Sequence, residues 1–320
     1  MTQPGCHRCD RSAVIHVAYA GHHLCDTHFI ESVERRVRRR IRKDELYDGD
    51  DVTWVIGISG GKDSAVLTTI LAETFGDNPT IELRGLCIHE GIEGYRDESL
   101  SAARVLADDL DIELEVRTYE ERFAVEMDTI ADEDPLDMAP CAYCGVFRRD
   151  ALESFAEEIE ADLMLTGHNL DDEAQTALMN IFEGDLFQMA KHYDASLAPL
   201  SKRRPQDVFV HRAKPLREIP EREVALYAHL RDLPAHMESC PHAERSFRGK
   251  IQSLLNDLES DHPGTRHSIM SGYEEFAGLA ADQLANGEDS SMGACEECGS
   301  PTTGSVCRTC ELLETVGGSR

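Results

Sequence analysis

The chain has 320 residues, of which 41% are hydrophobic, and this is enough for one large domain with appendages or for two domains. Its 61 acidic and 32 basic residues give a formal net charge of -29. Lysine occurs only six times, and an acidic, lysine-poor surface suits a high-salt cytoplasm. We therefore predict a halophilic protein, with an ordinary acidic protein as the alternative. No apolar run reaches membrane-spanning length and no signal-peptide pattern is present, so we expect a cytoplasmic chain without a membrane partner.

The first residues carry metal-ligand types in pairs. Cys6 and Cys9 have C-x-x-C spacing, and Cys25 and His28 follow with the same spacing. Two such knuckles can supply a tetrahedral zinc site, while an odd total of eleven cysteines without an export signal disfavours a disulfide framework. Because all four ligand places are filled, the zinc would be structural; a redox-active dithiol is the alternative. We assign residues 1–33 to this N-terminal zinc module.

A basic run comes next, within a predicted linker helix at residues 34–50. Arg35–Lys43 is rich in arginine, and Lys202–Arg204 forms a second basic cluster further along the chain. Against so acidic a background, such runs are candidates for contact with RNA phosphates. A solvated helix face is the alternative for both.

A glycine-rich stretch then separates a predicted strand from a predicted helix. Val52–Ile58 is a short β-branched run typical of a buried strand, and the apolar residues of Asp63–Phe75 recur at helical spacing. Between them lies GISGGKDS, residues 57–64. A strand, a glycine-rich turn and a helix start together favour an anion, because glycine lets the backbone approach phosphate and the helix start offers free N–H groups.

The spacing of this loop differs from the Walker pattern. Three residues separate Gly57 from Gly61 instead of four, and Asp63 follows Lys62 where a hydroxyl would hold Mg²⁺. The loop is therefore not a standard β,γ-cleaving phosphate loop. A glycine-rich turn with an incidental lysine is the alternative.

Strands and helices alternate from here on, which predicts an α/β fold with a doubly wound parallel sheet at residues 51–218. The further strands are expected at 80–89, 112–118 and 161–166, and the helices at 95–110, 141–160 and 171–182. Such sheets bind ligands at the carboxyl ends of their strands. The glycine-rich loop, His89–Gly91 and Gly167–Asp172 all fall there, so we expect them to converge on one nucleotide.

Three cysteines lie in the middle of the chain. Cys141 and Cys144 have C-x-x-C spacing, and Cys240 lies far downstream beside Pro241. Three thiolates could hold an iron–sulfur cluster with one iron open, or they could carry persulfide and disulfide chemistry. Zinc completed by a histidine such as His242 is the third interpretation.

The C-terminal third is predicted to be helical and to end in a second zinc module. Helices are expected at 221–231, 243–259 and 265–284, within a helical extension at 219–286 that carries the third central cysteine. A polar linker at 286–291 leads to a module at 287–320. Its ligands would be Cys295, Cys298, Cys307 and Cys310, a compact four-thiolate pattern typical of structural zinc.

Several motifs together resemble one enzyme family. SGGKDS at 59–64 resembles the signature of the PP-loop ATP pyrophosphatases, which adenylate a substrate and release pyrophosphate. With PCAYCG at 140–145, TGHNLDDEAQT at 166–176, Cys-Pro at 240–241 and two terminal zinc modules, the chain resembles the tRNA 2-thiouridine synthetases. The resemblance is to the branch of archaeal and eukaryotic wobble-uridine thiolases and TtuA-type enzymes. The related tRNA-cytidine thiolases lack the paired terminal modules.

The resemblance implies where ATP would bind. The nucleotide would lie on Ser59, Gly60, Gly61, Lys62, Asp63 and Ser64, with adenine near His89 and with contributions from Gly167 and Asp171. Mg²⁺ would be held by Asp63 or by Asp171 and Asp172. Lys62, Asp63 and Asp172 would take part in catalysis.

The resemblance also implies a reaction. A uridine oxygen attacks the α-phosphate, pyrophosphate leaves, and sulfur then displaces AMP at C2 of the base, at tRNA position 34 or alternatively at position 54. Cys141, Cys144 and Cys240 would hold a 4Fe–4S cluster whose open iron receives hydrosulfide, or two of them would carry persulfide and disulfide. Arg148 stands where the TtuA-type branch tends to have a catalytic lysine; arginine hardly deprotonates, so its role would be electrostatic.

The implied partners are tRNA and a ubiquitin-like sulfur carrier with a C-terminal thiocarboxylate, together with its E1-like activator. A homodimer is expected from the same resemblance. Two other classes remain as alternatives: an ATP-dependent amide-forming ligase that shares the loop, and a non-enzymatic zinc-bound RNA adaptor. The central cysteines argue against the ligase, and the intact SGGKDS loop argues against the adaptor.

Overall fold

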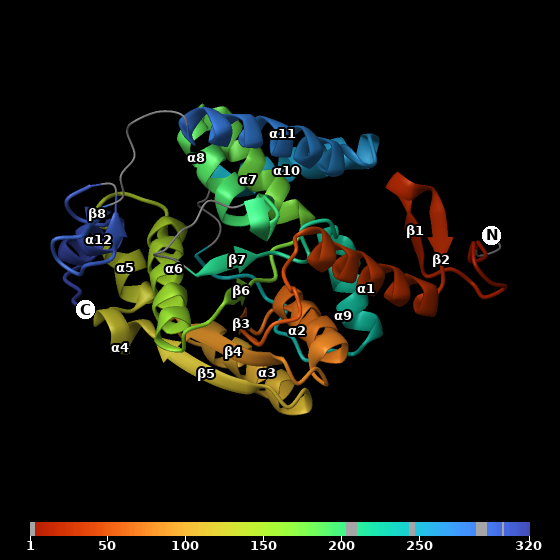
Figure 1. The fold of residues 1–320 in the computed structure, drawn as a ribbon, viewed down its shortest axis with the longest axis horizontal. Coiled ribbons are helices and arrows are strands. Elements are labelled where there is room, and N and C mark those ends of the chain that lie inside the picture. The colour runs from red at the N-terminus through yellow and green to blue at the C-terminus, as the bar shows by residue number, and fades with distance from the viewer. Residues whose placement is uncertain (1–3, 203–209, 243–246, 286–292, 303) are drawn as a thin grey trace.

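A computed structural model describes residues 4–202, 210–242, 247–285, 293–302 and 304–320 (Figure 1). Arg203 and Arg204 of the second basic cluster, the first residues of the helix predicted at 243–259 and the linker predicted at 286–291 lie outside these ranges. The strands are β1 (Ile15–Val17), β2 (His22–Leu24), β3 (Val52–Gly57), β4 (Ile81–His89), β5 (Glu113–Thr118), β6 (Leu163–Leu165), β7 (His211–Ala213), β8 (Gly293–Ala294) and β9 (Pro301–Thr302).

The helices alternate with these strands as predicted. They are α1 (Asp26–Lys43), α2 (Lys62–Phe75), α3 (Tyr95–Asp109), α4 (Tyr119–Phe123), α5 (Met127–Glu133), α6 (Pro140–Glu158), α7 (Leu170–Glu183), α8 (Leu186–His192), α9 (Glu221–Leu230), α10 (Phe247–Asp261), α11 (Thr265–Ala285) and α12 (Arg308–Val316). Short helical turns occur at Ala18–Ala20, Tyr193–Leu197 and Leu200–Lys202.

The central sheet has the order β5-β4-β3-β6-β7, and every neighbouring pair is parallel. The chain adds strands outward from β3 to β5 and then returns to place β6 on the other side of β3. The strand order therefore reverses between β3 and β6, and this is where doubly wound sheets bind ligands. The predicted parallel, doubly wound sheet is confirmed.

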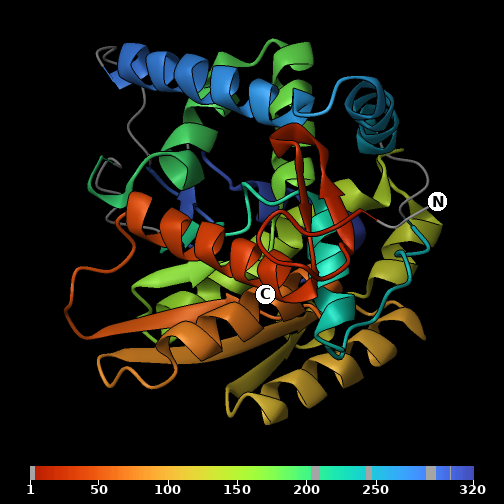
Figure 2. The ribbon, with the colours of Figure 1, turned by 90° about the vertical axis from the view of Figure 1, so that its right-hand side faces the viewer.

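The alternation of side chains along β3 explains why helices cover both faces of the sheet. Trp54 and Ile56 pack in one hydrophobic cluster with residues of α1, α2, α3 and α9, whereas Val55 packs in a second cluster with residues of α4, α5, α6 and α12. Successive strand residues point to opposite faces, so a continuous apolar run demands cover on each. Figure 1 shows the sheet between these helical layers, and Figure 2 looks onto it from the side of α1, α2 and α9.

A third hydrophobic cluster lies outside the sheet and joins α7, α8, α10 and α11. These helices form a layer above β7 in Figure 1. Tyr273 of α11 is buried there, and its hydroxyl accepts a hydrogen bond from Asn180 of α7 at 2.7 Å. Within the helical extension predicted from the sequence, α10 and α11 thus pack on the helix that follows β6, whereas α9 packs with α1 and α2.

The boundaries predicted from periodicity are close, but several short elements were not predicted: α4, α5, α8, α12, β7 and the strands of the two terminal modules. Between residues 185 and 215, where the periodicity is weak, the chain forms α8 and the edge strand β7. β7 has three residues and gains its stability from pairing with β6. So short a strand carries too little pattern to be recognised in a sequence.

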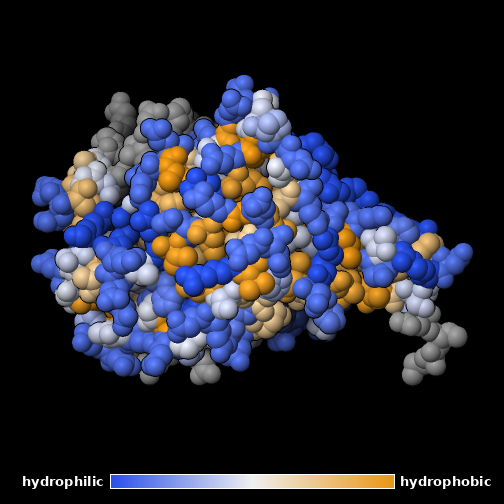
Figure 3. Space-filling model, turned by 90° about the horizontal axis from the view of Figure 1, so that it is seen from below, coloured by the Kyte–Doolittle hydropathy of each residue, from blue (hydrophilic) through white to orange (hydrophobic). Residues whose placement is uncertain are grey.

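The surface is mostly hydrophilic, as the charge balance predicts. Seen from below, hydrophobic residues gather near the centre of one face with hydrophilic residues around them (Figure 3). Within the described ranges, none of the helices combines the length and the apolar character that crossing a membrane requires.

Candidate nucleotide and cysteine site

Two glycines shape the loop between β3 and α2. Gly60 has a φ of +80°, and a Cβ there would run into the carbonyl group of Ser99. Gly167, which follows β6, approaches the loop so closely that a Cβ would lie 2.8–2.9 Å from backbone atoms of Asp63 and Ser64. The loop after β3 and the segment after β6 are thus in backbone contact, which only glycine permits.

The start of α2 is left open for an anion. Gly61 is its N-cap residue and supplies no side-chain cap. The Ser64 hydroxyl donates to the carbonyl oxygen of Gly61 at 2.9 Å and lies 3.2 Å from the Ser59 hydroxyl, so these serines brace the loop from within. The uncapped N–H groups and the helix dipole make this turn a phosphate site.

Lys62 is held between two carboxylates. Its Nζ lies 3.0 Å from Asp63 Oδ2 and 2.9 Å from Glu221 Oε1 at the start of α9. Burial lowers the pKa of Lys62, but the two carboxylates more than offset this and raise it, so the ammonium group stays charged. A nucleotide phosphate would therefore compete with Glu221 for this cation.

The two acidic residues after β6 have different surroundings. Asp171 is buried, and its Oδ2 accepts from the Glu221 N–H at 2.8 Å while its Oδ1 pairs with Arg266 at 2.9 Å. Both of its oxygens thus bind protein groups that hold α9 and α11 in place. Burial raises the pKa of Asp172 to about 6, and the nearby charge of Asp63 adds to the rise. Asn169 links these two carboxylates, because its backbone N–H donates to Asp172 Oδ2 at 3.1 Å and its side-chain amide donates to Asp63 Oδ1 at 2.9 Å.

His89 lies at the carboxyl end of β4, as predicted. Its Nδ1 accepts from the Gly91 N–H at 3.3 Å, and its Nε2 lies 3.5 Å from Asp97 Oδ1. The imidazole is half-buried beside the start of α3, and its predicted place near adenine stays a prediction.

Glu90, the residue after β4, connects two arginines. It is 1% exposed; its Oε1 accepts from Arg148 Nε at 2.8 Å, and its Oε2 pairs with Arg96 Nε. Arg96 in turn donates to the carbonyl oxygens of Ser59, at 3.2 Å, and Ile88. Sequence reasoning did not single out Glu90 or Arg96, although both lie in the segment after a strand end where ligands bind.

The central cysteines meet at the start of α6. Cys141 and Cys144 are one turn apart on this helix, and Cys141 Sγ lies 3.9 Å from the carbonyl oxygen of His242, two residues beyond Cys240. Burial raises the pKa of the Cys240 thiol, and the neighbouring Cys141 and Cys144 add to this. The fold therefore brings Cys240 close to Cys141 and Cys144, which precede it by nearly a hundred residues.

Arg148 contacts this cysteine group directly. Its Nη2 donates to Cys144 Sγ at 3.2 Å. The carboxylate of Glu90 raises the pKa of Arg148 well above its ordinary value. The guanidinium therefore stays protonated, and it can stabilise negative charge on sulfur but cannot accept a proton.

The four ligand residues of the first predicted zinc site lie together. Ligand atoms of Cys6, Cys9, Cys25 and His28 all lie within 4.8 Å of one another. Cys6 and Cys9 precede β1, and Cys25 and His28 lie at the start of α1, so the β1–β2 hairpin folds the two knuckles together. Thiolates and an imidazole in this arrangement suit Zn²⁺, and the helix that begins here continues into the basic run.

The second predicted zinc site assembles in the same way. Sulfur atoms of Cys295, Cys298, Cys307 and Cys310 also lie within 4.8 Å of one another. Burial raises the pKa of Cys295, but backbone N–H groups, beginning with that of Cys307, outweigh this and lower it to about 6. Four thiols with such backbone donors favour a thiolate-bound metal.

The C-terminal module packs on the cysteine helix. Leu312 and Leu313 of α12 are buried in the same cluster as Tyr143 and Phe147 of α6. Arg320 pairs with Asp150 of α6, and the Ser319 N–H donates to the carbonyl oxygen of Phe123 at 2.9 Å. The module therefore supports the helix that carries Cys141, Cys144 and Arg148.

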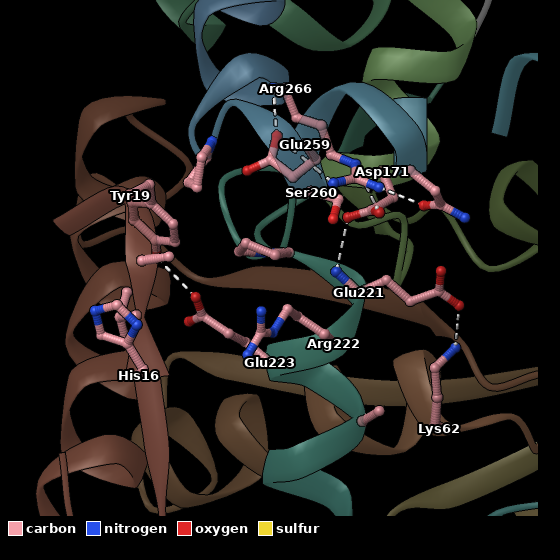
Figure 4. Close-up of a pocket in the computed structure, with 16 residues that line it drawn as sticks. His16, Tyr19, Lys62, Asp171, Glu221, Arg222, Glu223, Glu259, Ser260 and Arg266 are labelled. Carbon is pink, nitrogen blue, oxygen red and sulfur yellow. Dashed lines mark hydrogen bonds and ion pairs between the residues drawn. The ribbon is translucent and has the colours of Figure 1, made fainter. Parts of the chain in front are cut away.

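A cavity of about 590 Å³ borders the loop on the side of the N-terminal module (Figure 4). Tyr19 and His16 line one wall, and the start of α9 lines another. Lys62 reaches it beside Glu221, but the glycines and serines of the loop do not line it. Of the loop residues 57–64, Lys62 alone lines this cavity, and Glu223 in its wall is already paired with Arg36.

The basic run on α1 has an inner and an outer face. Arg40 is buried against Asp44 and pairs with Glu218 at 3.0 Å, so its charge is used inside the protein. Arg35, Arg39 and Arg42 are exposed, and their spacing of four and three residues places them on one helix face. The part of the predicted RNA-contact run that faces solvent is this outer face.

With the fold and site in view, comparisons with known proteins identify the family. The PP-loop domain family matches residues 31–251, and the N-terminal LIM domain of the 2-thiouridine synthetase TtuA matches residues 6–30. The chain belongs to the PP-loop family, as its loop and sheet order predict.

Its relatives within that family are named for tRNA thiolation. The tRNA 2-thiolation protein NcsA of Haloferax volcanii is 60% identical over 316 residues, covering 97% of this chain and 98% of the relative. The tRNA-5-methyluridine(54) 2-sulfurtransferase of Pyrococcus horikoshii is 32% identical, covering 96% of this chain and 93% of the relative. A solved structure, the U34-tRNA thiolase NcsA from Methanococcus maripaludis with its [4Fe-4S] cluster, has a TM-score of 0.76 at 34% identity and covers 87% of this chain and 89% of that one.

Proposed function

We propose that this chain is an ATP-dependent tRNA-uridine 2-sulfurtransferase that acts at the wobble position 34. One observation carries the proposal: the open phosphate turn and the cysteine group lie at the same edge of the sheet. Ser59 follows β3, and Glu90 follows β4 and holds the arginine that touches Cys144. An adenylation site and a group of sulfur ligands are what a thiolase needs side by side.

The chain's residues can perform the first step. The turn after β3 would bind the phosphates through its N–H groups, and Lys62 would stabilise charge on them. The uridine O2 attacks the α-phosphorus, the bond between the α-phosphorus and the bridging oxygen breaks, and pyrophosphate leaves. Asp63 and Asp172 would hold Mg²⁺ on the phosphates, because Mg²⁺ prefers oxygen ligands and usually binds through one or two carboxylates.

In the second step, hydrosulfide attacks C2 of the adenylated base, the C2–O bond breaks and AMP leaves. Arg148 remains cationic and would stabilise the anionic sulfur near Cys144. No oxidant or reductant is required, because the oxygen leaves with AMP and the sulfur enters at the same oxidation level.

The cysteine group suits an iron–sulfur cluster better than a single zinc ion. Cys141, Cys144 and Cys240 are not among the described residues whose ligand atoms all lie within 4.8 Å, unlike the two terminal groups. A cluster is larger than one ion and needs thiolates that stand farther apart. Three protein thiolates would leave one iron of a bound cluster without a protein ligand, and that iron would supply a place for hydrosulfide. The two terminal groups would hold structural zinc.

The finer assignments rest on the family. The 60% identical relative is named a tRNA 2-thiolation protein, and the structure with a TM-score of 0.76 is named a U34-tRNA thiolase. These names favour position 34 over position 54. A ubiquitin-like thiocarboxylate carrier with its E1-like activator would deliver the sulfur, the cytoplasm would be the compartment, and the exposed face of α1 would contact tRNA. A homodimer is part of the same proposal.

The test is position-resolved mass spectrometry of tRNA from a strain that lacks this protein, complemented with the wild-type chain or with Cys141→Ser. We expect 2-thiouridine to disappear from position 34 and only the wild-type chain to restore it. Loss of sulfur at position 54 alone would move the substrate position. Persistence of every thiolated base in the deletion strain would contradict the proposed function altogether.

A further inference from the structure

A buried carboxylate lies between the nucleotide loop and the cysteine group. Glu90 is 1% exposed, and each of its oxygens meets a different guanidinium, from Arg96 on α3 and from Arg148 on α6. Burying a carboxylate costs free energy unless the carboxylate is paired with a cation. Glu90 is paired with two cations, and they come from separate helices.

On one side, Arg96 fixes the backbone of the nucleotide loop. Its side chain is 5% exposed and donates to the Ser59 carbonyl oxygen at 3.2 Å and to the Ile88 carbonyl oxygen. Ser59 is the second residue after β3, and Ile88 lies near the end of β4. Arg96 therefore joins the two strand ends that flank the phosphate turn.

On the other side, Arg148 would be free to move without Glu90. Its side chain is 49% exposed, and among the described residues its recorded hydrogen-bond partners are Glu90 and the Cys144 sulfur. Nε and Nη2 both approach Glu90 Oε1, at 2.8 and 2.6 Å, which sets the plane of the guanidinium. The same Nη2 then reaches Cys144 Sγ at 3.2 Å.

We propose that Glu90 is a positioning residue that holds the guanidinium of Arg148 against the sulfur of Cys144. Through Arg96, Glu90 also fixes this guanidinium relative to the nucleotide loop. The inference rests on the proposed function and deepens it. Hydrogen bonds and ion pairs connect five groups one after another: the Ser59 carbonyl, Arg96, Glu90, Arg148 and the Cys144 sulfur. The two guanidiniums and one carboxylate sum to a single positive charge beside the cysteines, which favours anionic sulfur there.

Replacing the carboxylate by an amide isolates this role. Glu90→Gln keeps the size of the side chain but removes the charge that separates two like-charged guanidiniums. The amide NH₂ can only donate, and so can both arginines. Arg148 would then turn toward solvent, because half of its side chain is already exposed, whereas the buried Arg96 would keep its two carbonyl acceptors.

The experiment uses the full-length, cluster-loaded chain and compares Glu90→Gln, Arg148→Gln and the double variant. We expect each single variant to lower the rate of tRNA thiolation at saturating ATP by about tenfold or more, as for loss of a charge-assisted hydrogen bond. The double variant should be no slower than Arg148→Gln, because Glu90 acts through Arg148. ATP affinity should change little in all three.

A matched control residue lies on α6, the helix that carries Arg148. Glu153 of α6 is also buried and charge-paired, but its partners are Arg212 of β7, at 2.5 Å, and the N–H of Val210 just before that strand. Glu153→Gln should lose stability without a specific loss of thiolation. If it loses as much activity as Glu90→Gln, or if the effects of Glu90→Gln and Arg148→Gln add, a positioning role is excluded.

A second readout separates this inference from the proposed function. Electron paramagnetic resonance of the reduced cluster should change in the same way in Glu90→Gln and Arg148→Gln, and not in Glu153→Gln. This holds even if wild-type protein fails to thiolate tRNA. In a chain purified without a cluster, the rate of Cys144 alkylation by iodoacetamide should fall in the same two variants. Unchanged signals and rates would overturn the inference. Where Glu90→Gln does not fold, Glu90→Asp keeps the charge but shortens the reach, and the same pattern is expected.

Discussion

The side-chain amide of Asn169 joins the starts of two helices by binding Asp63. Its Nδ2 donates to Asp63 Oδ1 at 2.9 Å, while its Oδ1 accepts from the N–H groups of Asp171 and Asp172 at 2.9 and 3.2 Å. These hydrogen bonds fix the start of α2, beside the phosphate turn, relative to the start of α7 after β6. Both ends of one amide are used, so no carboxylate can replace it without loss.

The first prediction separates these two functions of Asn169. Asn169→Asp keeps an oxygen for the N-cap but places a carboxylate against Asp63, whereas Asn169→Ala loses both contacts. We expect Asn169→Ala to cost about 1 kcal/mol of stability through the lost cap. Asn169→Asp should keep the melting temperature but weaken MgATP binding, because Asp63 is pushed away. Equal ATP affinity for Asn169→Asp and wild type, measured by calorimetry, would show that Asp63 does not depend on this amide.

The second prediction concerns the two central glycines of the loop. A Cβ at Gly60 would collide with the Ser99 carbonyl at a φ of +80°, whereas a Cβ at Gly61 would meet only the Ser59 hydroxyl at 3.6 Å. Gly60→Ala should therefore lower the free energy of unfolding by about 1–3 kcal/mol, as for strain at a position that requires positive φ. Gly61→Ala is the matched control and should unfold at nearly the wild-type urea concentration. Similar losses in both would mean that the loop tolerates no side chain anywhere.

The third prediction is a pH dependence that arises from Glu173. This residue is 1% exposed and pairs with Lys214 at 2.7 Å and His192 at 3.1 Å. Burial raises the pKa of Glu173, but Lys214 and His192 oppose this and lower it well below the ordinary 4.5. The unfolded chain therefore takes up the proton first as the pH falls. The stabilisation is fully present above about pH 4.5 and is lost below that value.

Glu173→Gln should remove this part of the acid dependence and cost about 3–5 kcal/mol near neutrality, because it leaves the Lys214 ammonium group without its counter-charge. Burial lowers the pKa of His192, so its imidazole adds no second cation there near neutral pH. Urea unfolding of both proteins at a series of pH values between 7 and 3.5 measures the difference. If the stability curves of variant and wild type stay parallel, Glu173 is not the source of the slope.

The fourth prediction concerns the C-terminal metal module. Because α12 packs on α6, loss of the metal there should loosen the helix that carries Cys141 and Cys144. Cys307→Ser should lower bound zinc and also lower the iron content of the reconstituted protein. Cys9→Ser in the N-terminal module is the control and should lower zinc alone. Metal analysis of both variants decides the matter, and unchanged iron in Cys307→Ser would contradict the supporting role.

The fifth prediction divides the basic run by face. Arg35 and Arg42 are exposed on α1, whereas Arg40 is buried against Asp44. A plot of the logarithm of the tRNA-binding constant against the logarithm of the salt concentration has a negative slope. Arg35→Gln and Arg42→Gln should each reduce the steepness of this slope by about one unit, as for one lost phosphate contact. Arg40→Gln should lower the melting temperature and leave the slope unchanged. Filter binding at several salt concentrations distinguishes the two classes, and unchanged slopes for the exposed pair would place tRNA elsewhere.

The sequence predicted the elements that have strong patterns. The continuous apolar run of β3, with Trp54 and Ile56 on one face and Val55 on the other, and the helix after GISGGKDS, were found by periodicity and glycine spacing. The terminal ligand sets were readable because C-x-x-C spacing places two sulfurs within one turn of chain, and their ligand atoms do meet within 4.8 Å.

What could not be predicted depends on contacts between distant segments. Glu90 and Arg148 are 58 residues apart, and nothing in either local pattern indicates an ion pair. Asp171 and Asp172 look alike in sequence, but Asp171 is bound to Arg266 and the start of α9, which only the packed helices of the C-terminal third could show. β7 was missed because three residues stabilised by a neighbouring strand leave no periodicity of their own.

The packing of α12 on α6 also has a consequence for how the protein is made. Helix α6 ends at Glu158, and its partner Leu312 is translated about 150 residues later, roughly ten seconds or more at ordinary ribosome speeds. Until then, the hydrophobic cluster that contains Tyr143 and Phe147 lacks Leu312 and Leu313, which complete it. The cysteine helix is therefore completed late in synthesis, and loading of any metal group there is expected to follow release of the chain from the ribosome.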